Sequence, residues 1–161
     1  MDGAVTNTGT LSQTKTVPRN ATTSFLVITA TTGGTRYFGV DVTLGNVGNM
    51  GPTSVAIQGN QSCSAAFRTL GMAVGRCYSI APTTPHTATV KFYYRSAEAL
   101  GNPAPVAYHL TGSTWISLTS TRGGSGEAMF VQAANVDSYS PFALKDPNVT
   151  TYYVVLPLIL R

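Results

Sequence analysis

The feature that most constrains the fold is a series of short segments rich in β-branched and aromatic residues, separated by glycine, proline, asparagine and threonine. Residues 86–95 are the clearest case, because Ala88, Val90, Phe92 and Tyr94 alternate with polar side chains. Alternation at every second residue is typical of a strand with one buried face, whereas helical periodicity is nearly absent. This spacing is typical of a β-sandwich or a β-barrel, and we expect an all-β, antiparallel sandwich of about 8–10 strands.

Other segments show the same β-rich character. We expect strands over residues 24–30, 36–44, 53–58, 76–81, 127–134 and 140–144. Residues 105–110 and 113–118 should form a hairpin, and residues 45–52 and 121–126 should be loops. In the segment 36–44, an inward face would carry the following side chains: Phe38, Val40, Val42 and Leu44.

The two ends of the chain differ from its middle. Residues 1–23 are polar and rich in threonine, and we expect an N-terminal arm there, followed by the sandwich over residues 24–148. Residues 149–161 should form an extra C-terminal strand that is apolar on both faces and must be covered on both sides. Its apolar residues are Tyr152, Tyr153, Val154, Val155, Leu156, Leu158, Ile159 and Leu160. Such a strand could be exchanged between subunits.

Charged residues make up only 10% of the chain, against about 25% in an average soluble domain. A surface with so little charge suits a secreted protein or one covered by its neighbours in an assembly. The ten basic residues are scattered, so the sequence does not predict a nucleic-acid partner. The longest apolar run is too short for a transmembrane helix.

Cys63 and Cys77 are the two cysteines, and we expect them to form a disulfide in an oxidising compartment. Two buried free thiols are the alternative. A metal site is not favoured, because zinc needs about four ligands and no histidine is near either cysteine in sequence. We expect no cofactor. Asn20, Asn60 and Asn148 begin N-x-S/T sequons and are candidate glycosylation sites if the source glycosylates exported proteins.

Catalysis is not expected. The six carboxylates are well separated in sequence, so a glycosidase pair would have to be assembled by the fold. The segment Gly123-Gly124-Ser125-Gly126 does not match the nucleophile-elbow pattern. His86 precedes an expected strand and His109 lies inside one, which favours structural roles for both.

The second half of the chain resembles an Ig-like β-sandwich module of bacterial secreted and envelope proteins. The similarity lies in residues 76–82, 88–94 and 108–109, in Trp115, and in the ending of Ser140-Pro141-Phe142-Ala143-Leu144 plus the apolar tail. This resemblance implies an extracellular Ig-like sandwich, usually without catalysis, and it implies no particular ligand. We therefore expect an Ig-like or Greek-key topology.

Two functions follow as hypotheses. The first is a structural subunit of a cell-surface filament or layer, in which copies of the chain assemble by exchange of the C-terminal strand. The alternative is a carbohydrate-binding or adhesive module that recognises a surface polysaccharide. Its candidate ligand face consists of Lys91, Tyr93, Arg95, Tyr108 and Trp115. This alternative requires the aromatic residues to lie exposed on one face.

Overall fold

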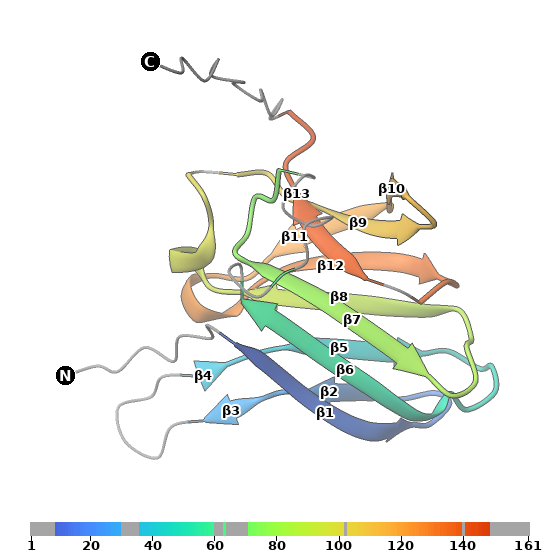
Figure 1. Ribbon diagram of the computed structural model, residues 1–161. Helices are drawn as coiled ribbons and strands as arrows, with labels where there is room; N and C mark the ends of the chain where they lie inside the picture. The colour runs from blue at the N-terminus through green and yellow to red at the C-terminus, as the bar shows by residue number, and fades with distance from the viewer. Residues whose placement is uncertain are drawn as a thin grey trace, which may run out of the picture.

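The computed structural model describes residues 9–29, 36–59, 63, 71–101, 103–139 and 141–148. Two antiparallel sheets face each other across the core (Figure 1). One sheet contains, in spatial order, β1 (Thr10–Val17), β6 (Gly51–Gly59), β7 (Arg76–Pro82), β13 (Phe142–Lys145), β9 (Val106–Thr111) and β10 (Thr114–Ser117). The other contains β11 (Ser120–Gly123), β12 (Met129–Val136), β8 (Ala88–Tyr94), β5 (Val40–Leu44) and β2 (Thr22–Phe25).

Outside the two main sheets, the described residues form three short pieces of secondary structure. They are a small sheet of β3 (Ile28–Thr29) and β4 (Arg36–Tyr37), and two single-turn 3-10 helices at Ser96–Glu98 and Gly126–Ala128. The all-β sandwich is thus confirmed, with six and five strands in its main sheets rather than about 8–10 in total. The Ig-like or Greek-key assignment stays a prediction.

The alternation of apolar and polar residues along a strand determines which side chains point into the core. In β8, Ala88, Val90, Phe92 and Tyr94 are all buried, as expected. Phe92 contacts residues of the opposite sheet, with its ring centroid 5.1 Å from those of Tyr78 and Phe142. Burial of each large apolar side chain contributes about 1.5–3 kcal/mol, so this contact between sheets is a main source of stability.

The predicted N-terminal arm is corrected by the structure. Residues 10–17 form β1, which pairs with β6 from Thr10 opposite Gln58 to Val17 opposite Gly51. β2 pairs with β5. The arm was inferred from polarity, but an edge strand buries only one face, and the threonines here have high β propensity. Its described part is therefore two strands of the sandwich.

The side of the sandwich formed by β1 and β2 is closed by side chains. Lys15 Nζ donates to the carbonyl of Ser24 at 2.6 Å, and the backbone amide of Leu26 donates to Gln13 Oε1 at 2.8 Å. A lysine on an edge strand also opposes pairing with another chain. This side is therefore an unfavourable acceptor for a foreign strand.

Residues 36–44 also differ from the prediction. The strand is interrupted between β4 and β5, so Tyr37 is buried and Phe38 points outward, half-exposed. Gly39 lies at the interruption, where a Cβ atom would come within 2.6 Å of the Phe25 carbonyl oxygen. The close approach of two backbones at this glycine reverses the alternation, which the pattern of apolar residues did not reveal.

Two loop predictions had different outcomes. The segment expected as a loop from residue 121 belongs in part to β11, which pairs with β12. The hairpin of β9 and β10 is confirmed, with Gly112 at φ +61° in its turn.

The C-terminal strand predicted over residues 149–161 lies outside the described residues. In the described part of the chain, no helix is long and apolar enough to cross a membrane.

Candidate functional site

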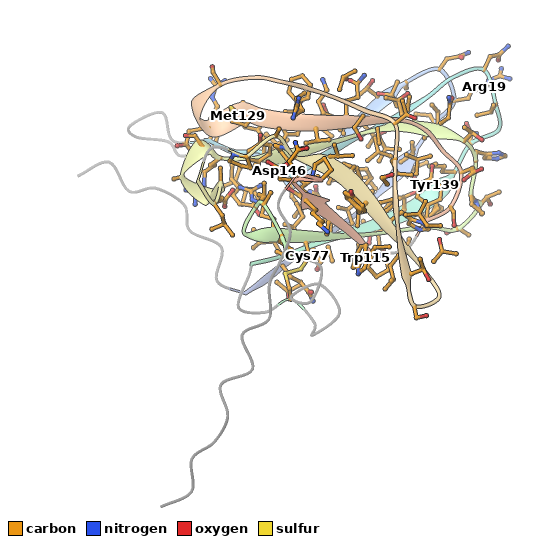
Figure 2. The ribbon with its side chains drawn as sticks, turned by 90° about the horizontal axis from the view of Figure 1, so that it is seen from above. Arg19, Cys77, Trp115, Met129, Tyr139 and Asp146 are labelled. Atoms are coloured by element: carbon orange, nitrogen blue, oxygen red, sulfur yellow. A yellow bond between two sulfur atoms is a disulfide. The ribbon has the colours of Figure 1, made fainter. Side chains whose placement is uncertain are left out.

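The predicted ligand face does not exist as one surface. Lys91 and Tyr93 lie on the outer face of the five-stranded sheet, because they alternate with the buried residues of β8. Tyr108 and Trp115 lie on the outer face of the six-stranded sheet, beside the disulfide. Figure 2 shows Trp115 and Cys77 on the same side of the molecule. These two faces point in opposite directions, so the aromatic residues cannot contact one ligand together.

Arg95 is not part of any exposed face. It is only 4% exposed, and its Nη2 lies 3.4 Å from Glu98 Oε1. Its backbone amide donates to the other oxygen of the same carboxylate at 2.8 Å. The alternation of β8 ends at Tyr94, and the chain then enters the 3-10 helix, which turns Arg95 inward. Its assignment to the ligand face was therefore wrong.

Tyr108 and Trp115 pack against the disulfide instead of forming a platform. The bond between Cys63 and Cys77 is present, with 6.2 Å between the Cα atoms. The two cysteines and Ala143 are buried, and Met72, Tyr108 and Trp115 pack around them. Trp115 is half-buried in this small outer cluster, which leaves only part of its ring for contact with a ligand.

The remaining candidate is the outer face of the five-stranded sheet. Tyr93 on β8 lies directly opposite Phe130 on β12, and their ring centroids are 6.0 Å apart. On the other side of Tyr93, the ring of Phe38 lies at 5.5 Å. All three side chains are half-exposed. Together they form an aromatic row that crosses the sheet perpendicular to its strands.

A polar row lies beside the aromatic one. Gln132, Lys91 and Asp41 are register partners on β12, β8 and β5. Lys91 Nζ lies 4.6 Å from the Phe130 ring centroid, within range of a cation–π contact. We call the two rows together the aromatic–polar face: Phe38, Tyr93, Phe130, Asp41, Lys91 and Gln132.

One hydrogen bond connects the rows. Tyr93 Oη donates to Asp41 Oδ2 at 2.9 Å. Burial and this hydrogen bond to a carboxylate raise the pKa of Tyr93 to about 12, because both favour the protonated phenol. The hydroxyl therefore stays protonated at neutral pH and holds the ring in one orientation on the face.

Sequence reasoning found Lys91 and Tyr93 but missed Phe38, Phe130, Asp41 and Gln132. Phe130 and Gln132 are two residues apart on a predicted strand, which places them on one face. Nothing in the sequence shows that β12 pairs with β8, however, because the pairing joins segments separated by a hairpin and a further strand. The aromatic row is a product of that pairing.

This arrangement matches what a sugar chain needs. The apolar face of a sugar ring packs on an aromatic side chain, while hydroxyl groups bind carboxylate, amide and ammonium groups beside it. The rings are tilted by 35° between Phe38 and Tyr93 and by 66° between Tyr93 and Phe130. Such a stepped surface suits a single flexible glycan chain better than the flat surface of a crystalline polymer.

Three of the described carboxylates, Asp41, Glu98 and Asp146, have close structural partners. Asp41 holds Tyr93, and Glu98 pairs with Arg76 at 2.7 Å. Asp146 accepts the backbone amides of Ala104 and Asn148 at 2.8 and 2.9 Å, and these bonds lower its pKa. Among the described residues, no three histidine, cysteine, aspartate or glutamate side chains are grouped so that they could hold a metal ion.

The predicted glycosylation sites lie at the surface where the structure describes them. Asn20 is exposed in the turn between β1 and β2, and Asn148 is exposed after β13. Asn60 lies outside the described residues.

Comparison of the chain with protein-family models, curated proteins and solved structures found no match.

Proposed function

We propose that this protein is a non-catalytic extracellular β-sandwich that binds a polysaccharide through its aromatic–polar face. The observation that carries the proposal is the row of Phe38, Tyr93 and Phe130 with hydrogen-bonding groups alongside. The disulfide and the scarcity of charged residues support an extracellular location.

The hydrogen bond between Asp41 and Tyr93 supports a role in binding rather than catalysis. A general acid or base needs an ionisable group that can reach the substrate. Asp41 is the carboxylate on the aromatic–polar face, and its Oδ2 accepts the hydrogen bond from Tyr93. Its role would be to orient a sugar hydroxyl and the Tyr93 ring.

Affinity electrophoresis in gels that contain a soluble neutral glucan, a xylan or a polygalacturonate tests the proposal. We expect at least one polymer to retard the protein. Tyr93→Ala and Phe130→Ala should each reduce the affinity about tenfold, on the scale known for ring stacking on aromatic side chains. Tyr108→Ala is the matched control, because it removes a half-exposed aromatic ring from the outer face of the other sheet.

Two results would contradict this proposal. One is the absence of retardation by a broad set of polysaccharides. The other is retardation that Tyr108→Ala abolishes and Tyr93→Ala leaves intact, which would move the site to the six-stranded sheet. Circular dichroism of each variant shows whether the fold is retained.

Assembly into a surface filament or layer is the second candidate function. It is favoured by the apolar segment of residues 152–160 together with the low charge of the chain. Each main sheet of the described residues is continuous, from β1 to β10 and from β11 to β2, so an incoming strand would have to add at an edge. Electron microscopy of the whole chain beside a variant lacking residues 149–161 tests this. Filaments or layers that vanish on truncation support assembly; monomers in both samples exclude it.

A further inference from the structure

A hollow lies at the side of the sandwich where β11 and the start of β12 meet residues 103–105. Its volume is about 380 Å³, within the range of about 300–1,000 Å³ that is usual for ligand sites. Its wall is apolar at Pro103, Pro105 and Met129, and its polar side chains are those of Tyr94 and Arg122. Arg122 lies opposite the buried Val131, so the hollow is on the inner side of this sheet edge, away from the aromatic–polar face.

Tyr94 lines the hollow and is almost completely buried. The residue is only 2% exposed, yet its hydroxyl makes no hydrogen bond to any other residue in the described part of the chain. The fully buried side-chain atoms without a hydrogen-bond partner in the described residues belong to Arg76 and Arg95, so the Tyr94 hydroxyl is within reach of solvent in the hollow. Since Tyr94 lines the hollow, its hydroxyl is a donor that a ligand there could use.

Arg122 is an exposed cation on the same hollow. Within the described residues it forms neither an ion pair nor a hydrogen bond, whereas Arg76 and Arg95 both pair with Glu98. Asp146 is the carboxylate that Arg122 influences electrostatically, but its oxygens already accept two backbone amides. The guanidinium group is thus available for another anion.

We propose that this hollow binds a carboxylate-bearing sugar ring, such as a uronic acid residue. The Arg122 guanidinium and the Tyr94 hydroxyl donate hydrogen bonds to the carboxylate, and Pro103, Pro105 and Met129 cover the apolar face of the ring. An acidic ligand follows because both polar side chains can donate and one carries a positive charge. The site does not depend on the aromatic–polar face, so either can fail alone.

Isothermal titration with sodium glucuronate tests the proposal on the whole chain, beside glucose and sodium acetate at the same ionic strength. We expect saturable binding of glucuronate, weaker binding of acetate and no binding of glucose. Arg122→Gln should weaken glucuronate binding roughly tenfold to a hundredfold, which is the scale of a hydrogen bond to a charged group. Tyr94→Phe should weaken it less and keep the fold, because it removes a hydroxyl that has no hydrogen-bond partner among the described residues.

Arg19→Gln is the matched control. It removes one exposed positive charge from the turn between β1 and β2, at the end of the molecule opposite Met129 and Asp146 (Figure 2). Binding that falls equally in Arg19→Gln and Arg122→Gln would overturn the site, because it would reflect net charge alone. Equal binding of glucose, equal binding of acetate, or no binding of glucuronate would overturn it as well.

Discussion

Arg76 and Glu98 form an ion pair within the sandwich, with Arg76 Nε 2.7 Å from Glu98 Oε2 and the arginine only 1% exposed. Arg76 belongs to β7 of the six-stranded sheet. Its Nη1 donates to the carbonyls of Phe38 and Tyr93, at 2.7 and 3.0 Å, which lie on the side of the five-stranded sheet. The guanidinium also stacks on Tyr37, 4.1 Å from the ring centroid. One side chain therefore joins both sheets.

Replacement of Arg76 should be strongly destabilising. We expect Arg76→Ala to lower the free energy of unfolding by about 3–5 kcal/mol, because it removes the closest partner of the largely buried Glu98 carboxylate and the donor to the carbonyls of Phe38 and Tyr93. Arg76→Lys should rescue only part of this loss, since an ammonium group cannot reproduce the planar fork and the stacking. Urea denaturation measures both, and Arg19→Ala at the exposed turn should stay within about 0.5 kcal/mol of wild type. A loss below about 1 kcal/mol in Arg76→Ala would show that the pair is unimportant.

Arg76 and the strand β8 differ in how well their positions can be predicted from the sequence. The inward face of β8 was predicted correctly, because alternation is a local signal. A buried arginine has no such signal: Arg76 precedes a cysteine on a predicted strand, and its partners come from three distant segments. Likewise, the aromatic–polar face depends on the pairing of β12 with β8. Such pairings arise from sheet order, which no local pattern encodes.

Reduction of the disulfide should cost stability. Cys63 and Cys77 are separated by 14 residues, and a loop of this size corresponds to roughly 3 kcal/mol. We therefore expect a reducing agent to lower the midpoint of urea denaturation. The double variant Cys63→Ser/Cys77→Ser should match the reduced protein and not respond to the reducing agent. Equal midpoints for oxidised and reduced protein would contradict the prediction.

The Tyr93 phenol should lose its proton only at high pH, and the free energy of unfolding should fall in that range. Its pKa in the folded protein is about 12, above the value of about 10 for an unperturbed phenol. As the pH rises, the unfolded chain loses this proton before the folded protein does. The contribution of Tyr93 to the free energy of unfolding is therefore fully present below pH 10 and is lost as the pH rises towards 12. Ultraviolet titration of wild type against Tyr93→Phe isolates the group. Asp41→Asn should lower the pKa of Tyr93; an unchanged value would show that the hydrogen bond is not its cause.

His109 should destabilise the fold in acid. Burial lowers its pKa below the usual 6.5, although Asp137 partly opposes the shift. The folded state thus favours the neutral ring, which packs 5.0 Å from Phe142. Its contribution to stability is present above pH 6.5 and falls as the pH decreases below that value. Thermal melts from pH 7 to pH 5 should show a smaller decline in His109→Gln than in wild type. Parallel declines would refute this role.

NMR titration of the labelled protein with neutral oligosaccharides from a retained polymer tests most directly whether the proposed glycan site lies on the aromatic–polar face. The chain has a single tryptophan, Trp115, on the opposite face, so its fluorescence reports on the competing site. We predict saturable shifts of the amides of Lys91, Tyr93, Phe130 and Gln132, with Trp115 emission unchanged. Shifts confined to β9 and β10 with altered Trp115 emission, or no shifts with any oligosaccharide, would contradict the account.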